Sequence, residues 1–315
     1  QGTSYSDAGA TASDNVDGNV SSSIIVSGDI VDPNTSGTYI IRYDVSDTAT
    51  NSATQVTRTV IVTDTTIPVI SLLGITPTNH QQGTAYIDSG VTAIDNINGD
   101  ISINVVITGT VDVNTASTYI LTYNVSDGSG NAAIAVTRTV IVADTAPPAI
   151  TLIGSASINH EQGDVYTDAG ATATDTIDGD VTASIVVTGT VDINTAGSYI
   201  LSYNVADTAT NAATTVTRTV NISDTTIPVI TLQGDATVDS TQGQLFTDPG
   251  TTALDNIDGD ISANVVTSGT IDINTAGTYV LNYDVADAAT NNATTVNRTV
   301  NIVSPVIVSI EAETA

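Results

Sequence analysis

The 315-residue chain has no cysteine, methionine, tryptophan or lysine, and it has a single phenylalanine. The absence of cysteine excludes disulfides, and without methionine as well nothing is left for sulfur oxidation. Without lysine, no Lys–Asn isopeptide bond can link two strands. We therefore expect small domains of this chain to be stabilised by a metal ion or a neighbouring chain.

Basic residues are also scarce. Five arginines face 34 acidic residues, which gives a net charge of −29, and only Glu161, Glu311 and Glu313 among the acids are glutamate. The lack of a basic patch argues against a nucleic-acid partner. The aspartates stand singly between Val/Ile/Thr runs, where short carboxylates cap turns or bind hard cations. Bound calcium or high salt would offset their mutual repulsion.

Long apolar runs are also missing. None approaches the 18 residues of a membrane-spanning helix, so we expect no insertion into a membrane. The first residues do not form a basic and apolar leader, so we expect any signal peptide to have been removed.

An internal repeat of 80 residues organises the chain. The segment Asp-Thr-Thr-Ile-Pro-Val-Ile begins at Asp64 and Asp224, with a variant at Asp144. The same period relates Tyr39, Tyr119, Tyr199 and Tyr279, and also Arg58, Arg138, Arg218 and Arg298. It predicts domains at 1–63, which lacks its first strand, and at 64–143, 144–223 and 224–303, followed by an extra strand at 304–315.

Each repeat has the composition of β-strands, since Val, Ile, Thr and Tyr dominate and helix formers are scarce. In the third repeat we expect strands at 148–154, 165–174, 181–188, 190–193, 199–206 and 214–222. Short strands at this spacing predict a β-sandwich. Tyr199, after Asp192-Ile-Asn-Thr, is placed like the tyrosine corner of immunoglobulin domains, although an ordinary strand tyrosine is the alternative.

Several motifs together resemble the bacterial surface-protein immunoglobulin-like repeat, the type also found in a pesticidal crystal protein. They are the Asp-Thr-Thr-x-Pro-Val-Ile opening, Tyr-x-Asp-x-Gly-x-x-Ala-x-Asp, Asp-Gly-Asp, and Tyr-x-Val-x-Asp…Asn. The resemblance covers nearly the whole chain and implies an all-β fold of four tandem immunoglobulin-like β-sandwich domains. It also implies an extracellular or cell-surface location in a bacterium or archaeon. We expect the domains to form an elongated rod, as in cadherins.

Three acidic elements recur in the repeats. The loop after the second strand contributes Asp14, Asp17, Asn19, Asp95, Asn98, Asp100, Asp175, Asp178, Asp180, Asp255, Asp258 and Asp260. The end of the sixth strand contributes Asp47, Asp127, Asp207 and Asp287, and the linkers contribute Asp64, Asp144 and Asp224. In an immunoglobulin sandwich these three elements meet at one end of the domain.

Such a gathering of carboxylate and amide oxygens favours calcium, which takes six to eight oxygen ligands. The chain has no cysteine, and histidine is absent from these loops, so zinc is disfavoured. The acid spacing does not fit an EF-hand. The alternative is that Asp and Gly simply form good turns.

Catalysis finds no support in the sequence, and we expect no enzyme. His80 and His160 recur at one place, and their repetition predicts a structural role. Arg218 shares the parity of inward-facing Val220, so either a bulge shifts the register or the arginine reaches an aspartate.

The two ends of the chain differ from the internal repeats. Gln1-Gly-Thr-Ser-Tyr aligns with Gln162-Gly-Asp-Val-Tyr, so the first repeat begins after its first strand, and Ser304–Ile310 resembles that strand. Head-to-tail self-association through Ser304–Ile310 is one reading, and a window cut from a longer array is the other.

Together these features predict a non-catalytic extracellular structural protein, a calcium-stiffened rod that serves as a filament subunit or an adhesin stalk. A cell-surface or matrix partner would fit that role. The alternative is a carbohydrate- or surface-binding module of a larger secreted enzyme, which needs exposed aromatic platforms.

Overall fold

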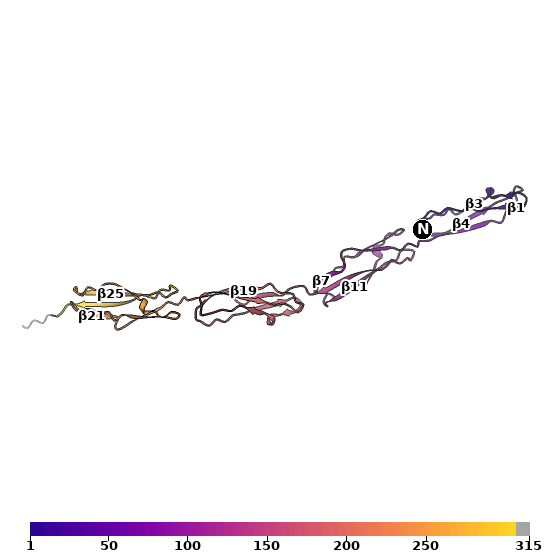
Figure 1. The fold of residues 1–315 in the computed structure, drawn as a ribbon. Helices are drawn as coiled ribbons and strands as arrows, with labels where there is room; N and C mark the ends of the chain where they lie inside the picture. Colours follow the sequence, from indigo (N-terminus) through magenta and orange to yellow (C-terminus); the bar gives the residue numbers. More distant parts are fainter. Residues whose placement is uncertain (307–315) are drawn as a thin grey trace, which may run out of the picture. The chain divides into compact units, whose positions relative to one another are not determined.

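The computed structural model describes residues 1–306, which fold into four all-β immunoglobulin-like repeats (Figure 1). The only helices in this part of the chain are four three-residue 3₁₀ turns, η1 to η4, and none of them could cross a membrane. The contacts divide the chain into two units, Gln1–Thr145 and Ala146–Ala315, each with two repeats.

The second repeat packs a three-stranded sheet against a four-stranded sheet. The first sheet has the order β6 (Val69–Leu72), β8 (Val91–Asp95), β9 (Gly99–Asp100). The second has the order β10 (Val106–Thr108), β11 (Ser117–Asn124), β12 (Val136–Ala143), β7 (Thr78–Gln81), and η2 (Ser102–Asn104) links the two sheets. Strand β7 runs parallel to β12, whereas the other pairs are antiparallel.

The third and fourth repeats have the same topology. The third consists of β13 (Ala149–Leu152), β14 (Ser157–Glu161), β15 (Ala171–Asp175), β16 (Gly179–Asp180), η3 (Thr182–Ser184), β17 (Val186–Thr188), β18 (Gly197–Asn204) and β19 (Val216–Ser223). The fourth consists of β20 (Val229–Leu232), β21 (Thr237–Thr241), β22 (Thr251–Asp255), β23 (Gly259–Asp260), η4 (Ser262–Asn264), β24 (Val266–Ser268), β25 (Gly277–Asp284) and β26 (Val296–Val303).

The first repeat has fewer strands. It consists of β1 (Ser13–Asp14), β2 (Gly18–Asn19), η1 (Ser21–Ser23), β3 (Ile25–Gly28), β4 (Gly37–Asp44) and β5 (Val56–Val62). Within residues 1–306 it has no counterpart of β6 or of β7. The predicted extra strand at 304–315 lies almost wholly outside the described residues, which end at Val306.

The strand ranges expected for the third repeat need several corrections. In place of one strand at 181–188, the structure has the 3₁₀ turn η3 at Thr182–Ser184 and then the shorter strand β17 at Val186–Thr188. The structure adds β14 at Ser157–Glu161, a polar strand that pairs in parallel with β19. It begins β15 at Ala171, so the expected strand at 165–174 is too long at its start. Residues 190–193 are not a strand, because the Asp192 carboxylate bonds the Asn194 amide and the Thr195 hydroxyl and so forms a turn.

The tyrosine corner is present in all four repeats. The Tyr199 hydroxyl donates to the Thr195 carbonyl at 2.8 Å, and Tyr39, Tyr119 and Tyr279 make the equivalent bond. Further along the same face, Leu201, Tyr203 and Val205 are buried, as alternation along a strand predicts. This bond anchors the turn that leads into the central strand of the larger sheet.

A buried arginine ties the two sheets together. Arg218 lies on β19 in unbroken register, so no bulge is present, and its guanidinium is fully buried. It pairs with Asp168 and donates to the carbonyls of Ile153, Ser155 and Gly170, which flank strands β13 and β15. The Tyr203 hydroxyl donates to the same Asp168 at 2.7 Å. Burial, together with this hydrogen bond, raises the pKa of Tyr203 to about 12. Equivalent ion pairs join Arg58 to Asp7, Arg138 to Asp88 and Arg298 to Asp248.

We predict that Arg218→Met destabilises the third repeat by about 3–5 kcal/mol, because it removes the buried guanidinium that pairs with Asp168 and donates to three carbonyls. Arg58→Met in the first repeat is the matched control. Its side chain is 36% exposed, and solvent-exposed ion pairs contribute only about 0–1 kcal/mol. Hydrogen exchange resolved by repeat measures both losses, and equal losses would contradict the argument.

Candidate metal centres

The loop after β8 holds one carboxylate in a fixed place. Asp95 ends β8, and its Oδ1 accepts hydrogen bonds from the amides of Ile97 at 2.9 Å and Asn98 at 2.7 Å. Gly99 closes the three-residue loop with a φ of 70°, a left-handed conformation that glycine adopts at little cost. The turn therefore uses one oxygen of Asp95 and leaves the other free to face inward.

The loop between β11 and β12 holds a second carboxylate. Asp127 Oδ1 accepts a bond from the Asn131 amide at 2.7 Å, and Oδ2 accepts one from the Asn131 side chain at 2.7 Å. Burial of Asp127 opposes ionisation, but the hydrogen bonds from Asn131, Ser129 and Gly130 together outweigh it and hold its pKa below the ordinary value. Asn131 also donates to the Asp64 carbonyl at 3.2 Å and so connects this loop to the linker.

The linker supplies the third carboxylate. Asp64 lies four residues before Pro68, which is fully buried, so the chain enters β6 beside both loops. One oxygen each of Asp64, Asp95 and Asp127 lie within 4.8 Å of one another. The three residues are only 6%, 3% and 8% exposed. Three elements that are far apart in sequence thus place three carboxylates at one point.

Two oxygens of this cluster have no partner. Oδ2 of Asp64 and Oδ2 of Asp95 are buried and accept no hydrogen bond. The arginine ion pairs engage Asp7, Asp88, Asp168 and Asp248, none of which belongs to the cluster. A buried carboxylate oxygen without a donor or a cation is costly. The residues therefore fit a divalent cation bound by oxygen ligands.

The fourth repeat has the same arrangement. Oxygens of Asp224, Asp255 and Asp287 lie within 4.8 Å of one another, and Oδ2 of Asp255 is buried without a partner. Asn291 bonds both Asp287 and the Asp224 carbonyl. Burial raises the pKa of Asp224, and the neighbouring charges of Asp255 and Asp287 add to the effect. This is the repulsion that a bound cation would remove.

The remaining repeats supply parts of the same pattern. In the first repeat, oxygens of Asp14, Asp17 and Asp47 lie within 4.8 Å of one another. In the third, Asp175 Oδ2 is buried without a partner, and Asp207 is bonded by Asn211. Its linker residue, Asp144, belongs to the first of the two units, whereas Asp175 and Asp207 belong to the second.

Several predicted site residues hold the loops together, and among them Asp17 also belongs to the cluster of the first repeat. Asp178 accepts bonds from the Thr208 amide and hydroxyl, which fastens the first loop to the second. Asp17, Asn98 and Asp258 make equivalent loop-to-loop bonds. Asp100 bonds the amide of Ser102 at the start of η2. Asn19, Asp180 and Asp260 occupy the same position before η1, η3 and η4.

Sequence reasoning missed a clamp on the linkers. The Glu161 carboxylate, at the end of β14, accepts hydrogen bonds from the amides and hydroxyls of Thr225 and Thr226. In the second repeat Gln81 takes the same place. Its side-chain oxygen accepts hydrogen bonds from the amide and hydroxyl of Thr145, and its side-chain nitrogen donates to the Asp144 carboxylate. The bonds from Thr225, followed by those from Thr226, lower the pKa of Glu161 to about 2. A Gln-Gly pair follows both Gln81 and Glu161, and this recurrence could have drawn attention to the two positions.

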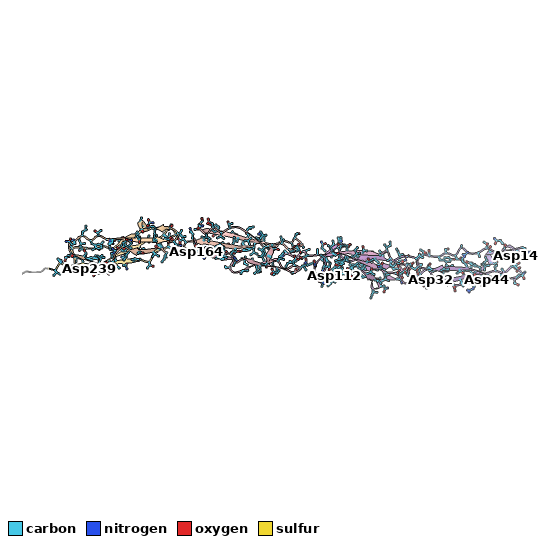
Figure 2. All side chains as sticks on the ribbon, turned by 90° about the horizontal axis from the view of Figure 1, so that it is seen from below. Asp14, Asp32, Asp44, Asp112, Asp164 and Asp239 are labelled. Carbon is cyan, nitrogen blue, oxygen red and sulfur yellow. The ribbon has the colours of Figure 1, made fainter. Side chains whose placement is uncertain are left out.

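The acidic residues outside the clusters lie mostly on the surface. Figure 2 labels six aspartates, of which Asp32, Asp112, Asp164 and Asp239 are exposed. Asp32 and Asp112 cap the turns before the tyrosine corners. Burial thus distinguishes the three carboxylates of the second-repeat cluster from the surface charge.

A family match covers all four repeats. Residues 1–62, 70–142, 150–222 and 230–302 match the family described as bacterial surface protein, Ig-like domain. Protocadherin gamma B2 domains 3–6 are similar at 11% identity, over 89% of this chain and 86% of that one, with a TM-score of 0.34. Drosophila N-cadherin EC1–4 gives 12% identity, 87% and 85% coverage and a TM-score of 0.27.

A relative by sequence is an uncharacterized 81.3 kDa protein of Acholeplasma phage L2. It is 31% identical over 210 residues, which are 63% of this chain and 28% of the phage protein. The chain thus spans less than a third of that relative. Matched in all four of its repeats, the chain belongs to the family of bacterial surface protein Ig-like domains.

Proposed function

We propose that this chain is a non-catalytic extracellular structural protein in which calcium ions stiffen the connections between tandem immunoglobulin-like repeats. The observation that carries the proposal is the pair of buried, unpartnered oxygens on Asp64 and Asp95, beside Asp127. Such an array would serve as the stalk of an adhesin or as the subunit of a filament.

Calcium suits the ligands better than other divalent ions. The clusters offer carboxylate oxygens only, with amide and carbonyl oxygens nearby. Zinc favours nitrogen and sulfur ligands, and magnesium needs near-ideal octahedral geometry that loop carboxylates seldom give. Calcium accepts flexible shells of six to eight oxygens, which waters would complete.

The mechanical effect follows from where the ligands come from. Asp64 belongs to the linker, whereas Asp95 and Asp127 belong to the loops of the repeat that follows. An ion bound by all three would fix the linker to that repeat. Without the ion, the three carboxylates repel one another and favour a freer linker.

The tyrosines favour a structural role over a carbohydrate-binding one. Of the 11 tyrosines, Tyr5 alone is exposed in residues 1–306, at 38%. Sugar-binding modules usually need exposed aromatic rings for stacking, and the remaining tyrosines are at least partly buried in the sandwiches.

We predict that the chain binds calcium with dissociation constants of about 10⁻⁴–10⁻³ M, the range of extracellular modules. Asp95→Asn removes one charge and should weaken binding at its cluster at least tenfold, as measured by isothermal titration calorimetry. Asp112→Asn is the control, because that exposed carboxylate caps a turn outside the clusters. Absence of calcium-dependent heat at millimolar concentrations would refute the proposal.

Calcium should also stabilise the repeats that bind it. A ligand that binds only the folded state at 100 times its dissociation constant adds about 2.7 kcal/mol per site. Thermal unfolding with calcium and then with a chelator should show this difference in the parent chain. In Asp255→Asn, the calcium-dependent gain in stability of the fourth repeat should be reduced. A gain as large as that of the parent chain would contradict the assignment of this cluster.

The clamp on the linker gives a prediction of pH dependence. The pKa of Glu161 lies at about 2, below its ordinary value of 4.5, because the charged form accepts the bonds from Thr225 and Thr226. Its contribution to stability is therefore present above about pH 4.5 and is lost as the pH falls through about 2. The Thr225 amide resonance should titrate with a midpoint near pH 2 in the parent chain.

The matched control for this clamp is already in the molecule. In Glu161→Gln the Thr225 amide should exchange faster and should lose its titration, because a neutral amide is a weaker acceptor. The Thr145 amide, bonded by Gln81, should keep its behaviour in both proteins. A midpoint near 4.5 in the parent would show that the clamp does not form.

A further inference from the structure

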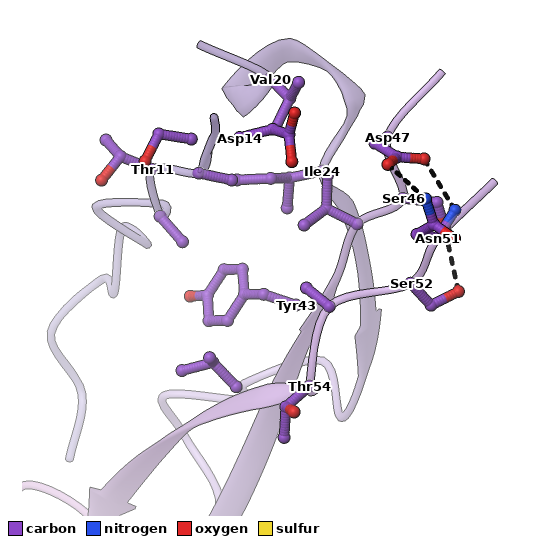
Figure 3. A pocket seen from close by; sticks show the side chains of 16 residues that line it. Thr11, Asp14, Val20, Ile24, Tyr43, Ser46, Asp47, Asn51, Ser52 and Thr54 are labelled. Carbon is purple, nitrogen blue, oxygen red and sulfur yellow. Dashed lines mark hydrogen bonds between the residues drawn. The ribbon is translucent and has the colours of Figure 1, made fainter. Parts of the chain in front are cut away.

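The linker before the fourth repeat is held by the repeat that follows it. Asn291 donates to the Asp287 carboxylate at 2.8 Å and to the Asp224 carbonyl at 3.2 Å, which ties the loop between β25 and β26 to the linker. Figure 3 shows the same bond between aspartate and asparagine in the first repeat, where Asn51 donates to Asp47. These bonds fix the backbone of Asp224 beside the cluster of the fourth repeat.

The third repeat holds the same linker through Glu161, and both repeats belong to one unit. Strand β14 ends at Glu161 and runs parallel to β19, so that Glu161 pairs with Ser223, the residue before Asp224. The Glu161 carboxylate accepts the bonds from Thr225 and Thr226 that form the clamp. The Thr226 amide is shared, because it lies 3.2 Å from Glu161 Oε1 and 3.2 Å from Asp224 Oδ1. One N–H thus joins the clamp carboxylate to a carboxylate of the cluster.

Glu161 thereby adds a fourth carboxylate to the surroundings of the cluster. Burial raises the pKa of Asp224, and the charges of Asp255 and Asp287 add to the effect. The contact with Glu161 acts in the same direction, in agreement with the shared N–H. A cation that binds among the three aspartates is therefore attracted by four negative charges.

The second repeat has a different group at this position. The side-chain nitrogen of Gln81 donates to the Asp144 carboxylate at 2.8 Å, while its oxygen accepts from the Thr145 amide at 2.7 Å. The clamp residue thus gives the linker aspartate a hydrogen bond. Glu161 is an ionised carboxylate and has no hydrogen to donate. It therefore holds the linker without donating to Asp224.

We propose that Glu161 sets the calcium affinity of the fourth-repeat cluster, because its charge attracts the ion and it donates no competing hydrogen bond to Asp224. Glutamate at this position favours an ion beside the linker, whereas glutamine supplies part of what the ion would supply. The affinity of one repeat is then set by a side chain of the repeat before it. This inference rests on the calcium binding proposed above and names the residue that tunes it.

Glu161→Gln in the full chain is the direct test, and Gln81 shows that glutamine fits this turn. The new amide should bond the Asp224 carboxylate. We expect calcium to bind the fourth-repeat cluster about tenfold more weakly, at the lower end of the range for groups that support metal ligands. The Ile257 amide, which donates to Asp255 at 2.8 Å, reports on this cluster in a calcium titration followed by NMR.

Two controls isolate the effect from a general loss of charge. Asp164→Asn removes one charge from an exposed side chain of the same turn, where solvent and salt screen it, so the affinity should stay within about twofold of the parent. The Ile97 amide, which donates to Asp95 at 2.9 Å, reports on the second-repeat cluster. Its response to calcium should be the same in every variant.

Glu161→Ala separates the proposed role from simple support of the linker. If Glu161 acted only by holding the linker, glutamine would bind calcium more tightly than alanine, because glutamine keeps an acceptor oxygen for Thr225. We expect instead that Glu161→Gln binds calcium no more tightly than Glu161→Ala, since its amide competes for Asp224. A glutamine variant that binds calcium like the parent chain, or more tightly than the alanine variant, would overturn the inference.

The failure of this inference can be told apart from the failure of the calcium proposal. If neither Ile97 nor Ile257 responds to millimolar calcium in the parent chain, the proposed function fails and this inference fails with it. If both respond in the parent and Ile257 responds equally in Glu161→Gln, calcium binding stands and the role of Glu161 is refuted. A weakened response at Ile257 alone supports both.

Discussion

A buried arginine in the second, third and fourth repeats is the contact on which their sandwiches depend. No disulfide joins the two sheets, and each core is small and mostly aliphatic. Arg138 and Arg218 extend from the larger sheet to carbonyls at the ends of strands in the smaller one. Five donors in a rigid plane hold these carbonyls and an aspartate together. The guanidinium thus takes the place of the covalent link found in antibody domains.

This internal tie fixes two strands at the ends opposite to the acidic cluster. Arg138 holds the carbonyls of Leu73 and Gly90, which flank β6 and β8. With these strands in place, the linker Asp64 and the loop residue Asp95 are brought to the same end of the sandwich. The position of the clusters therefore follows from the strands and loops that carry the three carboxylates. The ion would neutralise charge that the fold has already gathered.

Much of the fold could be predicted from the sequence because the repeat is so regular. The tyrosine corner and the alternation along Tyr199, Leu201 and Tyr203 are local patterns, and the structure confirms them. Strand β14 escaped prediction, since Ser-Ile-Asn-His-Glu is polar and lacks alternation. It forms because β19 offers a free edge for parallel pairing, which no local pattern reveals.

The sequence also could not show which aspartates join the clusters and which only hold the loops. Asp95 and Asp100 stand five residues apart in one loop, and both are aspartate. Only the packing decides which amides each one accepts, and so which oxygen is left free. The linker clamp depends on contacts between residues more than 60 positions apart, such as Glu161 and Thr225. Such pairings follow from topology alone.

The clamps on the two linkers differ in one chemical group, since Gln81 has an amide where Glu161 has a carboxylate. Two otherwise similar repeats therefore respond differently to pH. Gln81 is neutral at every pH, whereas Glu161 carries a charge whose hydrogen bonds depend on its ionisation. Acid therefore removes the charged acceptor of one clamp, whereas the Gln81 oxygen that accepts from Thr145 in the other is unchanged. Tandem repeats of such similar sequence would therefore not respond evenly to acid, because one clamp depends on the ionisation of a single carboxylate.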